Sequence, residues 1–189
     1  MAKIMARMPV IAERTETTSS VSFSNGLAVG KLVQVSVTPN VSDVKFYADD
    51  GVAEHNISFT DAALSLNVST VPTDAAEMMF GADTSATDTI LWYDVPSKYV
   101  GFGFISAESI DNTQKFKVSW FPKAIFALPT EQYDTKGESI TFNASTITGT
   151  AEKDPFNTDT SGNEEWKEEY EFTTAAAAVT KLKALAGIS

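Results

Sequence analysis

Apolar and polar side chains alternate along five stretches of the chain, with the period of two that is typical of a half-buried β-strand. The five stretches are residues 33–37, 64–68, 100–104, 116–120 and 140–144. We expect Pro39 and Asn40 to end the first of them, because this pair favours a turn. Amphipathic strands separated by turn residues predict an antiparallel β-sandwich or barrel.

A hairpin signal follows the first of these stretches. Asp49, Asp50 and Gly51 lie between two short apolar-rich runs, and Asp-Gly in that setting is a strong signal for a β-hairpin. We therefore interpret the two neighbouring carboxylates as turn residues and not as a catalytic acid and base.

Two segments have the pattern of a helix. Residues 73–80 begin with Thr73 and Asp74, which suit the first turn, and Gly81 follows as a stop signal. Residues 174–186 carry a narrow, alanine-rich apolar stripe, and Gly187 is well placed to end that helix. The stripe favours close packing on the sheet over membrane binding, because the polar face is only weakly basic.

The two ends of the chain differ in organisation. Residues 1–25 contain a run of threonine and serine with little periodicity, which predicts an extended N-terminal arm. Residues 26–189 contain no linker, so we expect a single domain. An acidic run at residues 152–171 ends in alternating acidic and aromatic side chains, which predicts a solvated edge strand.

Composition narrows the functional classes. The chain has 189 residues, enough for one domain with a core, and a formal net charge of −11, which disfavours tight binding to nucleic acid. It contains no cysteine, which excludes disulfides and thiolate metal sites. No stretch approaches the length of a membrane span, and the N-terminal residues are a poor match to a secretion signal.

Residues that could carry chemistry are few. His55 is the single histidine, so zinc and non-haem iron sites are not supported, and no serine lies in a nucleophile-elbow context. Residues 157–168 have the spacing of a calcium-binding loop, but Asn157 replaces the leading aspartate. Trp92 and Tyr93 are interpreted as core or subunit-interface residues, because base-stacking sites normally accompany a basic groove. We therefore predict no enzymatic activity, no cofactor and no metal.

The order and spacing of these features resemble the major tail protein of long-tailed, non-contractile bacteriophages, whose copies stack into the tail tube. The likeness runs from about Val29 to the C-terminus. The segments that carry it are KFYADDGVAE at 45–54, ALSLNV at 63–68, DVPSKYVGFGFISAE at 94–108 and WFPKAIFALPTEQYDTKGESITF at 120–142.

This resemblance implies a fold and a set of partners. The fold would be a mainly β, tail-tube type sandwich or barrel with two helices, and its copies would form stacked hexameric rings around a channel that conducts the genome. The implied partners are other copies of the chain, the tape-measure protein, the tail terminator and tip proteins, and genomic DNA in transit without tight binding. The implied location is the virion, after assembly in the bacterial host cytoplasm.

The resemblance also marks candidate site residues. Tyr47, Asp49, Asp50 and Gly51 match the family's hairpin, which we expect to contact an adjacent ring together with the N-terminal arm. The matching residues that we expect to serve the fold or a subunit interface are Lys123, Lys136 and Glu138.

Two other classes stay open at this point. A carbohydrate-binding, adhesin-like β-sandwich would expose an aromatic patch and bind glycans as a monomer. An enzyme with a lipocalin-like or jelly-roll barrel would need a pocket with converging polar groups.

Overall fold

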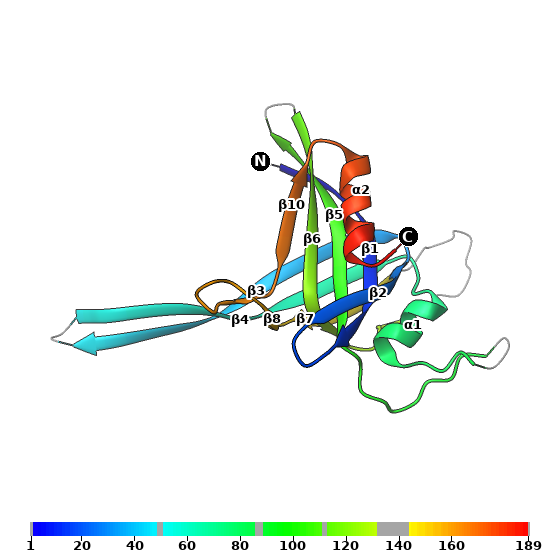
Figure 1. Cartoon of the computed structure of the whole chain (residues 1–189), viewed down its shortest axis with the longest axis horizontal. Coiled ribbons are helices and arrows are strands. Elements are labelled where there is room, and N and C mark those ends of the chain that lie inside the picture. The colour runs from blue at the N-terminus through cyan, green and yellow to red at the C-terminus, as the bar shows by residue number, and fades with distance from the viewer. Residues whose placement is uncertain (1, 49–50, 86–88, 111–112, 132–143, 189) are drawn as a thin grey trace, which may run out of the picture.

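The computed structural model describes residues 2–48, 51–85, 89–110, 113–131 and 144–188. Its main sheet is antiparallel and 8-stranded, in the order β2-β1-β5-β6-β7-β4-β3, with β10 also paired to β6, and a 2-stranded sheet joins β8 to β9 (Figure 1). The strands are β1 (Ala2–Glu16), β2 (Val21–Ala28), β3 (Leu32–Ala48), β4 (Gly51–Val68), β5 (Val100–Ile110), β6 (Thr113–Phe126), β7 (Ser145–Ala151), β8 (Asp154–Thr158), β9 (Glu164–Glu165) and β10 (Glu168–Phe172). The helices are α1 (Thr73–Phe80) and α2 (Ala175–Leu185). The prediction of a mainly β, antiparallel fold with two helices is confirmed, and the sheet is open, with β2 and β3 at its ends.

The prediction of an extended N-terminal arm at residues 1–25 is wrong. Residues 2–16 form β1, which pairs with β2 on one side and β5 on the other. The missing periodicity has a physical cause, since both faces of β1 are covered: Ile11 packs in one core cluster, while Val10 and Ala12 pack in a second. A strand buried on both faces has a continuous apolar run in place of an alternating one.

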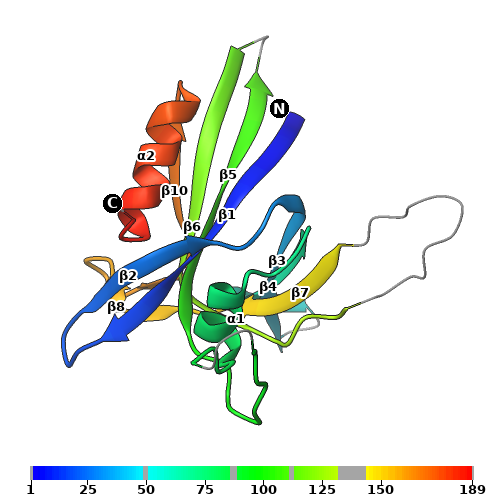
Figure 2. The same cartoon turned by 90° about the vertical axis from the view of Figure 1, so that its right-hand side faces the viewer.

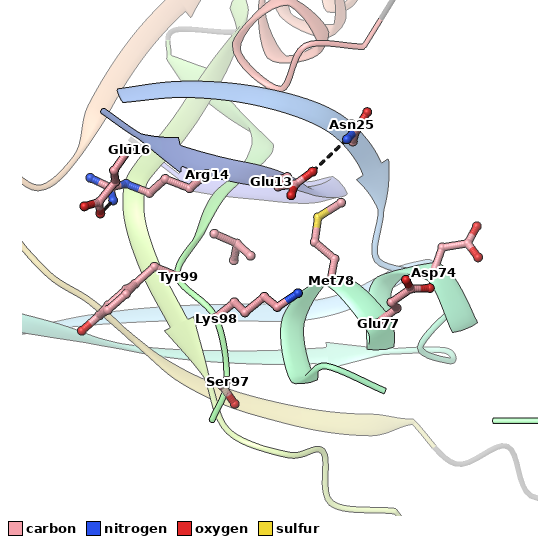
Figure 3. Close-up of a pocket in the computed structure, with 11 residues that line it drawn as sticks. Glu13, Arg14, Glu16, Asn25, Asp74, Glu77, Met78, Ser97, Lys98 and Tyr99 are labelled. Carbon is pink, nitrogen blue, oxygen red and sulfur yellow. Dashed lines mark hydrogen bonds and ion pairs between the residues drawn. The ribbon is translucent and has the colours of Figure 1, made fainter. Parts of the chain in front are cut away.

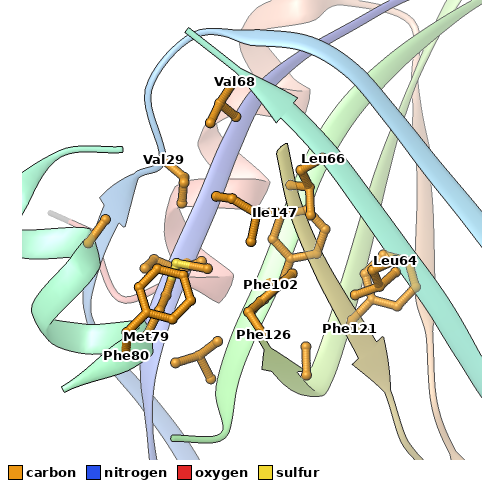
Figure 4. Close-up of a cluster of buried hydrophobic side chains, with 14 of the residues drawn as sticks. Val29, Leu64, Leu66, Val68, Met79, Phe80, Phe102, Phe121, Phe126 and Ile147 are labelled. Carbon is orange, nitrogen blue, oxygen red and sulfur yellow. The ribbon is translucent and has the colours of Figure 1, made fainter. Parts of the chain in front are cut away.

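Two apolar cores lie on opposite faces of the curved sheet. The first is enclosed by the sheet and α1 and contains Phe102, Phe121 and Phe126 (Figure 4). The second lies between the sheet and α2, around Trp120 and Leu182, and Figure 2 shows α2 beside β10 and β6. The sheet is therefore the middle layer of the molecule.

The glycines of β5 mark a close approach of side chains to the strand. A Cβ added at Gly101 or Gly103 would lie 2.5 or 2.6 Å from the ring of Trp120. The alternation seen in the sequence is confirmed here, because Phe102 and Phe104 face the first core while the two glycines lie under the indole of Trp120. The glycines thus make room for the largest side chain of the second core.

Both predicted helices are present. The hydroxyl of Thr174 accepts a hydrogen bond from the Ala177 amide at the start of α2, and Gly187 follows its end with a φ of 65°. Helix α1 ends at Gly81, whose φ is 70°. The expected side-chain cap of α1 is absent because Pro72, which has no suitable side chain, occupies the capping position.

Two details of the predicted strands need correction. Strand β3 continues through Pro39 to Ala48, because β3 is an edge strand and tolerates a residue that cannot donate on its outer side. The register of β3 with β4 shifts between Leu32 and Gln34, which leaves Val33 exposed. Residues 140–143 of the fifth predicted strand lie outside the described residues, whereas the edge strand expected in the acidic run is confirmed as β10.

Candidate assembly interface

The hairpin of β3 and β4 is much longer than the sheet that supports it. Its register runs from Leu32 opposite Val68 to Ala48 opposite Gly51, while β7 pairs with β4 only between Ala62 and Val68. The distal part therefore projects from the molecule as a two-stranded ribbon (Figure 1). We call residues 41–48 and 51–57 the outer hairpin.

The outer hairpin carries large apolar side chains that nothing covers. Every side chain described between Val41 and Tyr47 and between Glu54 and Ile57 is exposed. The large apolar ones, each between 56 and 66 % exposed, are Val41, Val44, Phe46, Tyr47 and Ile57. A lone two-stranded ribbon is at best marginally stable in water, and an exposed apolar surface marks an interaction site. This surface is therefore suited to burial against another molecule.

The apolar side chains occupy both faces of the ribbon. Residues directly opposite each other in an antiparallel pair share a face, and neighbours along a strand alternate. Ile57 lies opposite Asp43 on one face, while Phe46 lies opposite Glu54 and shares the other face with Val44. A single flat partner would cover only one of these faces, so the ribbon is suited to insertion between two surfaces.

The sequence-predicted hairpin residues lie at the tip of this ribbon. Tyr47 is near the end of β3 and Gly51 begins β4, so two residues connect the strands, as the Asp-Gly signal predicts. Asp49 and Asp50 are those two residues and lie outside the described part of the chain. The hairpin itself is confirmed, and its contact with an adjacent ring stays a prediction.

Lys123 belongs to a polar cluster at the end of the sheet. Its Nζ lies 2.9 Å from a carboxylate oxygen of Glu152 and 4.6 Å from the ring centre of Tyr99, whose hydroxyl donates to the same carboxylate. Burial raises the pKa of Tyr99, and the hydrogen bond to Glu152 raises it further. Lys123 therefore connects β6 to the segments before β5 and after β7, as expected of a fold residue. Lys136 and Glu138 lie outside the described residues.

A second exposed apolar segment lies at the other end of the long axis from the hairpin tip (Figure 1). Its large side chains are Ile90, Leu91, Trp92, Tyr93 and Val95. The ring of Trp92 lies 6.1 Å from that of Phe80 in α1, yet half of the Trp92 side chain is exposed. In the sequence, residues 90–95 are an apolar run without strand or helix periodicity, and this is the signal that could have indicated an exposed surface.

A pocket beside α1 is lined by polar and apolar side chains, and several of the polar ones are hydrogen-bonded or ion-paired. It has a volume of about 590 Å³ and lies between β1, β2, α1 and the segment before β5 (Figure 3). Asn25 donates to Glu13 across β1 and β2 at 2.8 Å, and Thr84 donates to Glu77 of α1. Arg14 is turned toward Glu16 and Asp154. These bonds tie neighbouring elements together.

The calcium-like spacing at residues 157–168 forms a turn. One carboxylate oxygen of Asp159 accepts the backbone amides of Ser161 and Asn163, each at 2.8 Å. Hydrogen bonds from Asn163 lower the pKa of Asp159. Among the described residues there is no group of three or more acidic, histidine or cysteine side chains that could hold a metal ion. His55 lies exposed on the outer hairpin, with its Nε2 2.7 Å from Asp43.

Two comparisons with known proteins find no relative of this chain. A scan of the chain against protein-family models finds no match, and a search of curated proteins finds none. Within the described part of the chain, no helix has the length and apolar character needed to cross a membrane.

Proposed function

We propose that the chain is a structural subunit of a phage tail tube, in which copies associate into hexameric rings that stack around a channel. The observation that carries the proposal is the outer hairpin, whose apolar side chains are exposed on both faces. Insertion between neighbouring subunits would bury both faces and so stabilise such a ribbon. That the assembly consists of stacked hexameric rings is inferred from the resemblance of the sequence to major tail proteins.

The open sheet supports self-association of a head-to-tail kind. Strands β2 and β3 end the sheet and present backbone groups that can pair with another chain. When the edge of one copy meets the opposite edge of the next, the contact is heterologous, and repetition closes a ring or extends a filament. Rings would unite the sheets of six copies into the tail-tube type of β-structure.

The two exposed apolar surfaces suit stacking. The outer hairpin and residues 90–95 lie at opposite ends of the long axis (Figure 1). In a stack of rings, the hairpin of one subunit would reach the neighbouring ring. The tape-measure protein, the tail terminator and the tip proteins would then be further partners, and the assembled protein would reside in the virion.

The test is the self-association of matched variants at high protein concentration. Phe46→Ser with Ile57→Ser removes one apolar side chain from each face of the outer hairpin. The control Leu128→Ser removes a side chain of similar exposure, 64 %, outside both the hairpin and the edge strands. Sedimentation velocity should show large assemblies for the parent and the control, and monomers for the hairpin variant. Equal assembly of both variants would contradict the role of the hairpin.

A glycan-binding β-module is the second candidate. The exposed, adjacent side chains of Trp92 and Tyr93 favour it, because aromatic faces can stack on sugar rings. Glycan-array binding by a monomer, lost on Trp92→Ala, would support this function in place of the tail tube.

A further inference from the structure

Strand β2 contains the only asparagine of the sequence that a glycine follows, in the pair Asn25 and Gly26. The register of β2 with β1 shifts at this pair, so that its two residues lie opposite Ala12 alone. Such a β-bulge leaves one residue out of the regular ladder of hydrogen bonds. The pair therefore lies where the pairing of the end strand of the sheet is locally interrupted.

The backbone restricts which residues these two positions accept. Asn25 has a φ of 53°, in the left-handed region, which asparagine tolerates better than most residues other than glycine. A Cβ added at Gly26 would lie 2.3 Å from the carbonyl oxygen of Ala186, which follows α2. Asparagine followed by glycine therefore suits both the bulge and the packing of the chain after α2 against β2.

The Asn25 amide is accessible and is bonded to a carboxylate. Asn25 is exposed, and its Nδ2 donates a hydrogen bond to Oε2 of Glu13 at 2.8 Å (Figure 3). This bond joins β2 to β1. Solvent water reaches the amide, and a change of charge at residue 25 acts directly on Glu13.

We propose that Asn25 is a site of spontaneous deamidation. The backbone nitrogen of Gly26 attacks Cγ of Asn25, so that a C–N bond forms and the bond from Cγ to Nδ2 breaks. The Nδ2 nitrogen leaves as ammonia, with the proton that the Gly26 nitrogen gives up. Water then opens the resulting succinimide at either carbonyl carbon, which leaves aspartate or isoaspartate at position 25. Glycine favours the attack because it has no side chain to hinder the approach of its nitrogen.

The folded chain slows this reaction through Glu13. The bulge must open locally before the Gly26 nitrogen can reach Cγ, and the Glu13 carboxylate opposes that opening by holding the Asn25 amide. The attack also places negative charge on the oxygen of the same amide, which a carboxylate so close disfavours. Glu13 is therefore a residue that protects Asn25.

Deamidation replaces an attractive contact between β1 and β2 by a repulsive one. An ionised aspartate at position 25 has no proton to donate, and it brings a second negative charge next to Glu13. Isoaspartate also adds one carbon to the main chain of β2. The reaction therefore weakens the pairing at this end of the sheet, irreversibly and with time.

The first test follows the parent protein over time, with a second asparagine of the same chain as the control. Asn163 is also exposed, and its Nδ2 also lies 2.8 Å from a carboxylate oxygen, that of Asp159, but glutamate follows it. The folded protein is kept at mildly alkaline pH, digested at acidic pH and analysed by mass spectrometry. We expect aspartate and isoaspartate to accumulate at position 25 while Asn163 stays an amide. Conversion at position 25 no faster than at position 163 would overturn the proposal.

The second test concerns the protecting residue. Glu13→Ala removes both the hydrogen bond and the neighbouring charge, so the conversion of Asn25 should become several-fold faster. Asp74→Ala makes the same change in net charge at another exposed residue that lines the same pocket, and it should leave the rate unchanged. Both variants are first checked for folding by circular dichroism. Equal rates in the two variants would overturn the role of Glu13.

The third test concerns the effect of the product on the fold. Asn25→Asp reproduces one product and should lower Tm at neutral pH relative to the parent. Glu13→Gln in the Asn25→Asp protein should recover the loss, because the new amide can donate to the new carboxylate. An Asn25→Asp protein as stable as the parent, or one that Glu13→Gln does not rescue, would overturn the effect proposed for the contact between β1 and β2.

Discussion

A buried ion pair between β1 and β8 gives a direct test of the N-terminal strand. The Arg14 guanidinium lies 2.8 Å from the Asp154 carboxylate, and the two side chains are 1 and 0 % exposed. Removing Asp154 leaves the buried guanidinium with the half-exposed Glu16 carboxylate as its remaining ion-pair partner, and breaking a buried pair in this way costs about 3–5 kcal/mol. Asp154→Ala should therefore reduce the free energy of unfolding by about that amount.

The size of the effect can be read from thermal unfolding. For a domain of this length, each kcal/mol changes Tm by about 2–4 °C, so Asp154→Ala should lower Tm by roughly 6–20 °C. Replacing both partners by apolar residues, Arg14→Met with Asp154→Leu, should recover most of the loss, because no buried charge is then left unpaired. The assay is circular dichroism at fixed pH, supported by urea unfolding.

An exposed pair provides the control. Lys167 and Glu169 are also bonded, but the Glu169 side chain is 43 % exposed, so Glu169→Ala should cost less than about 1 kcal/mol. A loss for Asp154→Ala as small as that for Glu169→Ala would refute the reasoning. It would also count against the place of β1 within the sheet, since Arg14 belongs to that strand.

Three further predictions concern the second core and its surroundings. Gly103→Ala should destabilise the fold by about 1–3 kcal/mol in urea unfolding, because its Cβ would lie 2.6 Å from the Trp120 ring; an unchanged midpoint would contradict this packing. Leu182→Ala should cost about 2–5 kcal/mol because this α2 side chain is fully buried against the sheet, and a loss below 1 kcal/mol would contradict that burial. Burial, then the hydrogen bond to Glu168, raises the pKa of Tyr170 to about 12. Because the tyrosine of the unfolded chain ionises near its ordinary value of about 10, stability should fall as the pH rises from about 10 to about 12. Tyr170→Phe should lessen that fall in Tm, and an identical pH profile would contradict the assignment.

The alternation of apolar and other residues predicted the strands that pack one face against a core and turn the other face to a different environment. In β5 and β4 the alternation was read correctly, because Phe102 and Leu64 face the first core while their neighbours do not. Strand β1 was missed because Val10 and Ile11 are buried on opposite faces, which removes the alternation. Pro39 was read as a strand end because edge and central strands look alike until the order of strands is known.

The candidate interface was predicted only in part. The Asp-Gly turn located the hairpin, but not the length of ribbon beyond the supporting strand β7. Val44 and Phe46 are as apolar as core residues, so sequence could not show that they are exposed. The ion pairs of Lys117 depend on the register of β5, β6 and β10, which brings Glu108 and Glu171 to it from separate parts of the chain.

Electron microscopy of the purified protein at high concentration tests the proposed assembly most directly. We expect hollow tubes or stacked rings with six-fold symmetry, with the outer hairpin buried between subunits. Particles that stay monomeric at every concentration, or that assemble with the outer hairpin still exposed to solvent, would contradict it.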